Sequence, residues 1–244
     1  MKTRLCVSRE LINGSEAVVE GDRARYLGRV LRLRVGDELT IFDGTGPEWS
    51  ATIDDMTRNT VTLAIGESRD ATAESPLKIH LVQGISRGER MDYVVQKATE
   101  LGVKRITPVL TEYGVVKLDE KRAAKRRDRW EGVAVSACEQ CGRSRLPLVD
   151  APLPLKEWFG AKPADADLDL ILAPGAATPL AKVPAPGTKV SILNGPEGGF
   201  SQIESEDAEA SGFTSVSLGP RILRTETAAP AALAVMQANW GDLG

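Results

Sequence analysis

Short apolar runs alternate with helical patterns from residue 77 onward, and this alternation constrains the fold more than any other feature of the chain. Strands are predicted at 77–83, 105–110, 168–172, 190–193 and 216–218, and helices at 86–101, 120–142, 201–211 and 227–239. Strands that alternate with helices predict parallel βαβ units and an α/β fold with helices on both faces of the sheet. Ligands of such sheets bind beyond the carboxyl ends of the strands.

Two Ser-x-x-Glu patterns predict where helices of this region begin. Ser86 with Glu89, and Ser201 with Glu204, each match a capping box, in which two side chains satisfy two free backbone N–H groups. Gly102 and Gly212 follow the corresponding apolar patterns and predict the helix ends.

The first 66 residues have a different character, because most of their apolar residues alternate over short stretches. Strands are predicted at 39–42, 49–53 and 61–65, with a hairpin turn at Asp43-Gly44 and a short helix at 22–31. Leu27, Val30 and Leu31 share one face of that helix. Short strands at this spacing predict a small β-barrel. The polar segment 67–76 is predicted to be a linker, which divides the chain into domains 1–70 and 71–244.

The composition is that of an ordinary globular protein, with 42% hydrophobic and 27% charged residues among 244. No apolar run approaches the roughly 20 residues of a membrane span, and the first residues lack the apolar core of a signal peptide. We therefore expect a cytoplasmic protein. The net charge of −3 does not indicate nucleic acid, but five arginines lie within residues 23–34. Such a cluster favours phosphate contact or is a solvated helix face, and the sequence leaves both open.

The few cysteines and the single histidine predict neither a metal site nor a redox site. Cys138 and Cys141 form a C-x-x-C in the middle of a predicted helix, where thiols lack the activation of a helix N-terminus. A zinc ion would need two further ligands, and His80 and Cys6 are the remaining candidates of the usual types. His80 lies within a predicted strand, so we expect a structural role for it.

Two glycine-containing segments follow predicted strands and precede predicted helices. The first, 192–200, has no G-x-G-x-x-G or P-loop spacing, and its Glu197 suits a cationic or neutral ligand better than a phosphate. The second, 218–228, carries Arg221, Arg224 and Glu226, which a simple linker does not need. Neighbouring strand ends of this kind would enclose one small molecule, although a tight turn alone also explains the first segment.

These residues together resemble the ribosomal small-subunit RNA methyltransferase E family, which are uridine N3-methyltransferases of the SPOUT (α/β-knot) superfamily. The most specific matches are Gly195-Pro196-Glu197-Gly198-Gly199-Phe200 and the segment from Leu218 to Ala228. Further matches are the segments 87–92 and 96–102, Glu139-Gln140 with Gly142-Arg143, and Leu146-Pro147. The match extends over nearly the whole chain. In one departure, Arg25-Tyr26 stands where the family often has histidine.

The resemblance implies a fold, a reaction and partners. The N-terminal domain would be a PUA-like β-barrel that binds RNA, and the C-terminal domain would contain a deep trefoil knot that binds S-adenosylmethionine. The enzyme would be a homodimer without a metal, and its substrate a uridine of 16S ribosomal RNA, within the small ribosomal subunit.

The resemblance also implies roles for individual residues. Arg224 would stabilise the uridine anion. Glu226 would be the base, or else it would cap the last helix and pair with an arginine. The expected cofactor-binding residues are Leu172, Gly195, Pro196, Glu197, Gly198, Leu218, Gly219, Ile222, Leu223, Thr227 and Ala228. The expected RNA-binding residues are Arg4, Arg25, Arg32, Arg34, Arg87 and Arg90.

Two alternatives remain open from the sequence. Another SPOUT methyltransferase would act on a different ribosomal base or on transfer RNA. A non-catalytic ribosome assembly factor would need only RNA binding, and it would not need the two glycine-containing strand ends.

Overall fold

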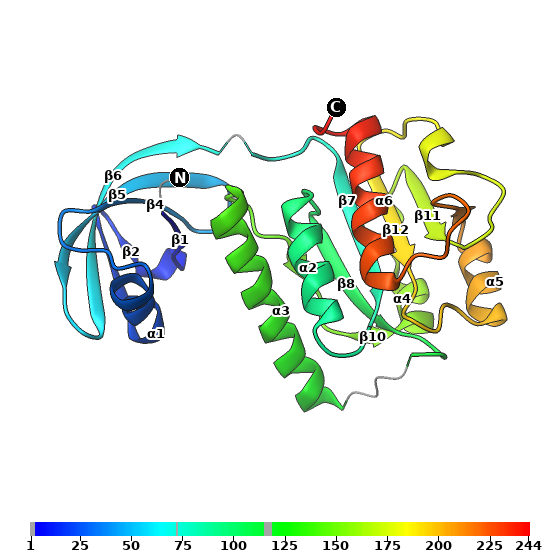
Figure 1. Ribbon diagram of the computed structural model, residues 1–244, viewed down its shortest axis with the longest axis horizontal. Coiled ribbons are helices and arrows are strands. Elements are labelled where there is room, and N and C mark those ends of the chain that lie inside the picture. The colour runs from blue at the N-terminus through cyan, green and yellow to red at the C-terminus, as the bar shows by residue number, and fades with distance from the viewer. Residues whose placement is uncertain (1–2, 72, 115–118) are drawn as a thin grey trace. The chain divides into compact units, whose positions relative to one another are not determined.

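The computed structural model describes residues 3–71, 73–114 and 119–244, and it comprises two compact units (Figure 1). The N-terminal unit contains Met1–Glu74 together with Cys138–Leu146, and the C-terminal unit contains Ser75–Ala137 and Pro147–Gly244. No feature of the sequence indicates that the short segment 138–146 belongs with the first unit.

The N-terminal unit is built on a six-stranded sheet with the order β1-β4-β5-β6-β3-β2. β1 pairs in parallel with β4, and the other neighbours are antiparallel. Its strands are β1 (Arg4–Cys6), β2 (Ile12–Asn13), β3 (Glu16–Glu20), β4 (Glu38–Phe42), β5 (Pro47–Met56) and β6 (Thr60–Asp70). Leu5, Leu27, Ile41 and Leu63 are among the side chains of its core. The predicted hairpin at Asp43-Gly44 is confirmed, because it joins β4 to β5.

The predicted linker at 67–76 is wrong over its first four residues, which continue β6. Arg69 lies opposite Glu48 on β5, and its Nε donates to Glu48 Oε1 at 2.6 Å. This cross-strand ion pair suits an antiparallel ladder, so a polar segment that lacks an apolar pattern still forms a strand.

The predicted helix at 22–31 consists of α1 (Gly21–Arg25) followed by a π-helical turn, Tyr26–Val30. A π turn spaces its hydrogen bonds five residues apart, so it rotates the following side chains relative to an α-helix. Leu27 is buried, whereas Val30, predicted on the same helix face, is 64% exposed.

The C-terminal unit contains a parallel sheet with the strand order β10-β8-β7-β12-β11-β13, and β9 also pairs with β8. The predicted parallel α/β architecture is confirmed. Its strands are β7 (Lys78–Gly84), β8 (Arg105–Leu110), β9 (Leu148–Val149), β10 (Leu153–Pro154), β11 (Leu168–Leu172), β12 (Lys189–Asn194) and β13 (Thr214–Val216). β13 ends at Val216 and not at 218, because Ser217 instead bridges to Pro179.

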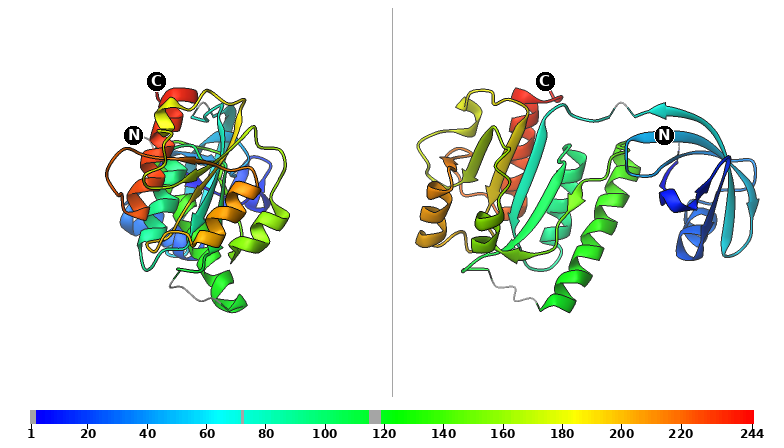
Figure 2. Two further views of the ribbon diagram at one scale, coloured as in Figure 1. Left: turned by 90° about the vertical axis from the view of Figure 1, so that its right-hand side faces the viewer. Right: turned by 180° about the vertical axis from the view of Figure 1, so that it is seen from behind.

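Helices cover both faces of this sheet, which lies between the two helical layers in Figure 2. The helices are α2 (Arg90–Glu100), α3 (Glu120–Cys141), α4 (Leu155–Ala161), α5 (Gln202–Ala210) and α6 (Thr225–Trp240). Leu81 and Ile192 pack with side chains of α2 and α6, whereas the next residues along their strands, Val82 and Leu193, pack with side chains of α4 and α5. Successive side chains of a strand point to opposite faces, so both faces are apolar.

One of the two predicted capping boxes is confirmed. Ser201 Oγ accepts from the Glu204 N–H at 3.2 Å, and Glu204 Oε2 accepts from the Ser201 N–H at 2.9 Å. The predicted box at Ser86 is wrong, because α2 begins only at Arg90 after a turn at Gly88 with φ of +61°. Ser86 Oγ is buried and has no hydrogen-bond partner within the described residues.

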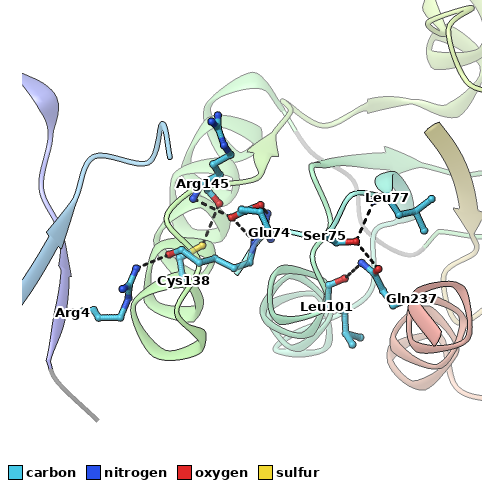
Figure 3. Close-up of polar contacts among 9 residues, drawn as sticks. Arg4, Glu74, Ser75, Leu77, Leu101, Cys138, Arg145 and Gln237 are labelled. Atoms are coloured by element: carbon cyan, nitrogen blue, oxygen red, sulfur yellow. Dashed lines mark hydrogen bonds and ion pairs between the residues drawn. The ribbon is translucent and has the colours of Figure 1, made fainter. Parts of the chain in front are cut away.

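A short chain of hydrogen bonds joins the start of the C-terminal unit to α6 and α2 (Figure 3). Ser75 Oγ donates to Gln237 Oε1 at 2.7 Å, and Gln237 Nε2 donates to the carbonyl of Leu101 at 2.7 Å. The Leu101 carbonyl lies at the end of α2, where the helix itself supplies no partner.

Polar contacts within the N-terminal unit hold the segment 138–146 in place. Glu139 Oε1 accepts from the backbone N–H of Cys6 at 2.9 Å and also pairs with Arg23. Arg143 pairs with Glu74 at 3.2 Å. Cys138 lies near the end of α3, and its burial raises the pKa of its thiol to about 12. This side chain therefore packs as a neutral group. The C-x-x-C lies in a helix as predicted, but at the C-terminal end of α3 and not in its middle.

Within the described part of the chain, no helix is both long and apolar enough to cross a bilayer. No three His, Cys, Asp or Glu side chains among these residues are grouped so that they would hold a metal ion.

Candidate functional site

A cavity of about 800 Å³ opens at the carboxyl ends of β11, β12 and β13. Two loops form much of its wall: the first loop, residues 194–200, follows β12, and the second loop, residues 217–224, follows β13. The position agrees with the general rule for ligands of parallel sheets. The lining residues from the two loops and the start of α6 are Asn194, Gly195, Pro196, Glu197, Gly199, Phe200, Leu218, Gly219, Arg221, Ile222, Leu223, Arg224, Thr225, Glu226 and Ala228.

Most of the residues expected to bind a cofactor line this cavity, together with Arg90, Arg224 and Glu226. Those expected residues are Leu172, Gly195, Pro196, Glu197, Leu218, Gly219, Ile222, Leu223 and Ala228. Gly198 and Thr227 are not among the residues that line it. The structure thus brings together two segments that are separated in sequence by β13 and α5.

Gly198 has a packing role. A Cβ atom at this position would lie 2.8 Å from the Cβ of Tyr113 and 2.9 Å from its carbonyl oxygen. The first loop therefore approaches the segment after β8 so closely that only glycine fits. The backbone N–H of Glu112 donates to Glu204 Oε1 at 2.8 Å and strengthens the same contact.

The first loop is held firmly on several sides. A Cβ on Gly84 would lie 2.5 Å from the backbone nitrogen of Pro196, so the end of β7 packs directly against the loop. Glu197 Oε1 accepts from the backbone N–H of Arg87 at 3.0 Å and from Arg90 Nη1 at 2.6 Å. Burial disfavours the charged carboxylate, but these donors and the loop's own backbone outweigh it, so the pKa of Glu197 lies below its usual value.

Glu226, in the first turn of α6, has one carboxylate oxygen without a partner. Its Oε1 lies 3.6 Å from Arg90 Nε, so Arg90 stands near both carboxylates of the site. Its Oε2 is buried and accepts no hydrogen bond within the described residues. A buried acceptor that stays unpaired costs about 1–3 kcal/mol, so this oxygen is suited to a donor that arrives with a ligand.

The second loop is more exposed than the first. Ser217 is fixed to the segment before it, donating to the Thr178 carbonyl at 2.9 Å and accepting from the Leu180 N–H at 2.9 Å. Beyond it, Gly219 has φ of +88°, and Ile222 is 84% exposed although it lines the cavity. Arg221 and Arg224 are also exposed.

Three buried polar residues beneath the loops were missed by the sequence analysis. Gln83 ends the apolar stretch of β7, Asn194 ends β12, and Thr225 begins α6. Their side chains are hydrogen-bonded to one another. A polar residue at or next to the last position of each buried strand is the available signal, but it does not reveal that Gln83 and Asn194 meet.

The arginines expected to bind RNA lie in different environments. Arg4 is largely buried and donates to Glu48 at 2.6 Å and Ser144 at 2.7 Å, which leaves little of it for a phosphate. Arg25 donates to Asn59 at 3.1 Å and pairs with Asp22. Arg32 and Arg34 are exposed, and Arg32 has φ of +57°. Arg87 is exposed beside the cavity, and Arg90 lines it.

Comparison with known protein families accounts for both units. A model described as an RNA methyltransferase PUA domain matches residues 19–66, and one described as an RNA methyltransferase domain matches residues 73–237. A ribosomal RNA small subunit methyltransferase E of Buchnera aphidicola is 36% identical over 218 residues, covering 89% of this chain and 88% of the relative. The chain belongs to the ribosomal RNA small subunit methyltransferase E family. The resemblance drawn from its motifs is thereby confirmed.

Two solved structures resemble this member of the family over their whole length. A methyltransferase of Legionella pneumophila, solved with the cofactor S-adenosylmethionine bound, is 40% identical with a TM-score of 0.94. The family member from Neisseria gonorrhoeae, also bound to S-adenosylmethionine, is 37% identical with a TM-score of 0.92. In both comparisons the match covers 100% of each chain.

Proposed function

We propose that this chain transfers a methyl group from S-adenosylmethionine to N3 of a specific uridine in 16S ribosomal RNA. The observation that carries the proposal is the cavity at the strand ends, where Arg224 and the unpaired Oε2 of Glu226 lie beside two glycine-containing loops. Membership of the family and the cofactor bound by two close structural neighbours support the same reaction.

The residues of the cavity suit S-adenosylmethionine. Its volume falls in the range of small-molecule sites, about 300–1,000 Å³. Leu172, Leu218 and Leu223 offer apolar surface, and the carboxylates of Glu197 and Glu226 offer negative charge to a cationic ligand. We propose that the lining residues expected from the sequence bind the cofactor, without Gly198 and Thr227. When bound, S-adenosylmethionine supplies an electrophilic methyl group on a sulfonium sulfur.

The chain's own residues would make uracil N3 reactive. N3 carries a proton, and it becomes a good nucleophile when that proton is removed. Glu226, whose Oε2 has no donor within the described residues, would accept it, with Arg90 Nε 3.6 Å from its other oxygen. Arg224 would stabilise the negative charge that develops on the base.

The RNA would be held by exposed arginines of both units. Arg32 and Arg34 on the N-terminal unit, and Arg87 at the cavity, are exposed and suit phosphate contact. Arg25 remains a weaker candidate because it is already paired with Asp22. Arg4 is not proposed as an RNA contact, because Glu48 and Ser144 hold it.

Further parts of the proposal follow from the family resemblance. The sheet of the N-terminal unit would close as a PUA-like β-barrel, and the C-terminal unit would carry a deep trefoil knot. The bonds between Ser217 and residues 178 and 180 support the knot, because they hold the chain leaving β13 against the long connection that precedes β12. We also propose a cytoplasmic homodimer with its sites at the interface, acting on the small ribosomal subunit.

Mapping the modified nucleotide tests the proposed reaction. Small ribosomal subunits from a strain that lacks this gene would be incubated with the protein and S-adenosylmethionine, and nuclease digests would be analysed by mass spectrometry. The proposal expects one new 3-methyluridine in 16S RNA. A methyl group on another ribosomal base, or on transfer RNA offered in parallel, would support a different SPOUT methyltransferase.

Cofactor binding separates an enzyme from an RNA-binding assembly factor. S-adenosylmethionine at about 100 times its Kd should stabilise the protein by about 2.7 kcal/mol, measured as a rise in Tm. Adenosine triphosphate at the same concentration provides the control for unspecific nucleotide effects. Absence of both a Tm shift and methyl incorporation would favour the assembly factor.

A further inference from the structure

A buried network of three side chains lies directly beneath the two loops. Thr225 Oγ1 donates to the Gly195 carbonyl at 2.6 Å and accepts from Gln83 Nε2 at 3.1 Å and Asn194 Nδ2 at 3.3 Å. Asn194 Nδ2 also donates to Gln83 Oε1 at 2.9 Å and to the Thr225 carbonyl at 3.1 Å. Gln83 Nε2 also donates to the Gly84 carbonyl at 2.8 Å.

The Thr225 hydroxyl uses its full hydrogen-bonding capacity in this network. A hydroxyl has one proton to donate and two lone pairs to accept, and Thr225 Oγ1 has one donor contact and two acceptor contacts. Gln83 is 0% and Thr225 is 6% exposed, so the side chains cannot exchange these partners for water without moving. Removal of one hydroxyl therefore disturbs two amides and a carbonyl at once.

The network occupies the point where the two loops meet. Asn194 is the first residue of the first loop, and Thr225 lies between Arg224 and Glu226 at the end of the second. The only direct hydrogen bonds that the structure shows between the first loop and this part of α6 are those made by Thr225, as far as the described residues go.

We propose that Thr225, with Asn194 and Gln83, is a positioning unit that sets Arg224 and Glu226 in register with the cofactor-binding first loop. The inference rests on the proposed function for the roles of Arg224 and Glu226. Thr225 does not itself touch the reacting atoms. It acts through its neighbours, because a shift of its backbone moves the two side chains on either side together.

The expected consequence is a separation between binding and turnover. Gly84 packs against Pro196, and Arg87 and Arg90 hold Glu197, so the first loop keeps its shape when the Thr225 hydroxyl is lost. Cofactor affinity should then change little. A displacement of about 1 Å of catalytic groups can slow a reaction roughly 100-fold, so methyl transfer should fall steeply.

Thr225→Val and Thr225→Ser test the proposal as a pair. Valine keeps the shape and removes the hydroxyl, whereas serine keeps the hydroxyl. The control is Thr99→Val in α2, because Thr99 is also buried, its hydroxyl donates to the Val95 carbonyl, and neither residue lines the cavity. For each protein, single-turnover transfer of labelled methyl groups to small-subunit RNA, the Kd for S-adenosylmethionine, and Tm would be measured.

We expect Thr225→Val to lower the transfer rate constant about 100-fold with a change in Kd below about threefold, and Thr225→Ser to restore the rate to within about fivefold. Thr99→Val should lose stability but keep its rate. The inference would be overturned if Thr99→Val lost as much rate as Thr225→Val at the same loss of Tm. It would also be overturned if Thr225→Ser did not restore the rate. Total methyl transfer is measured, so the rates of the variants can be compared whichever base accepts the methyl group. A target base other than uridine N3 would refute the proposed function, but the rate ratios between the variants would still decide the inference about Thr225.

Amide hydrogen exchange provides a readout that needs no turnover. Thr225→Val should speed the exchange of amides in residues 218–226, whereas the amide of Gly195 should change less because the first loop has other contacts, and Thr225→Ser should return the exchange to the wild-type rate. If exchange in residues 218–226 does not change in Thr225→Val, or if serine does not restore it, the inference fails, whether or not the wild-type protein methylates RNA.

Discussion

The two loops of the cavity follow neighbouring strands of one sheet, yet they are built in opposite ways. The first loop is fixed by Gly84, by the two donors to Glu197 and by the capping box that follows it. The second is fixed only near its ends, by Ser217 and Thr225, and its middle carries the exposed residues Arg221 and Ile222.

This difference indicates a division of work. A wall that already has its shape binds a small cofactor without a large cost of ordering, since preorganisation reduces the entropy lost on binding. A wall with exposed charged side chains such as Arg221 and Arg224 also offers contacts to a larger substrate. We therefore expect changes in the first loop to affect cofactor binding, and the loss of Arg224 in the second to affect methyl transfer.

The largest expected effect belongs to the second loop. Arg224→Ala should lower the methyl-transfer rate about 10³-fold, because it removes a charge that stabilises the developing anion, while the Kd for S-adenosylmethionine stays within about threefold. Single-turnover kinetics and isothermal titration would measure the two quantities. Arg221→Ala is the matched control on the same loop. Its fold-loss of methyl-transfer rate should be less than a tenth of the fold-loss in Arg224→Ala. Full activity in Arg224→Ala would refute its role.

Acidic pH tests whether a loss of activity comes from the two loops or from a loss of stability of the fold. His80 lies near the start of β7, at the other end of the sheet, and burial followed by the charge of Arg105 lowers its pKa to about 4. Its unfolded pKa is about 6.5, so the unfolded state binds more protons between these values, and stability falls as the pH drops from 6.5 to 4.

His80 should lower the free energy of unfolding by about 3 kcal/mol as the pH falls from 6.5 to 4. It should cause no loss above pH 6.5 and no further loss below pH 4. Denaturant unfolding at several pH values would measure it. His80→Gln should show a flatter profile, and the difference between the two profiles isolates this histidine from the carboxylates. Identical profiles would show that His80 does not carry the effect.

Gly84→Ala tests the rigid character of the first loop. The added methyl group would meet the backbone nitrogen of Pro196 at 2.5 Å, so the loop must shift. Overpacking of this kind costs about 1–3 kcal/mol of stability, and the Kd for S-adenosylmethionine should rise about tenfold. Gly132→Ala in α3, where the new methyl group has open space, should instead leave affinity unchanged and stabilise the protein slightly. Equal affinities in both variants would contradict the comparison.

The smallest effect is expected at Ile222. Its side chain is 84% exposed, so Ile222→Ala should change the free energy of unfolding by less than about 0.5 kcal/mol. If the side chain is covered when substrate binds, catalytic efficiency should fall about fivefold, which corresponds to about 1 kcal/mol of lost apolar contact. Ile203→Ala, at an exposed position of α5 that does not line the cavity, should have no effect on efficiency. Equal kcat/KM values in the two variants would remove Ile222 from the site.

Local sequence signals predicted much of the C-terminal unit. The strands at 105–110 and 168–172 and the capping box at Ser201 arise from patterns within a few residues, and the structure confirms them. The two loops were also found, because glycines and charged residues at strand ends are visible without knowledge of the fold.

The features that were missed or wrong depend on distant partners. Residues 67–70 form a strand because Glu48 lies opposite Arg69, and α2 starts late because the Arg87 N–H donates to Glu197. Gln83, Asn194 and Thr225 meet only after the sheet has formed. Gly198 looked like a ligand-binding glycine, but its need for a small side chain comes from Tyr113.

The segment 138–146 has a consequence for how such a chain can be divided or recombined. Because it belongs to the N-terminal unit, the polypeptide passes from one unit to the other three times, after residues 74, 137 and 146. A fragment beginning at Ser75 would carry Glu139 and Arg143 without Cys6 and Glu74, their partners in the intact protein. The N-terminal unit is therefore not an exchangeable cassette of residues 1–74 alone, and a functional graft of it must carry this nine-residue insert along with those residues.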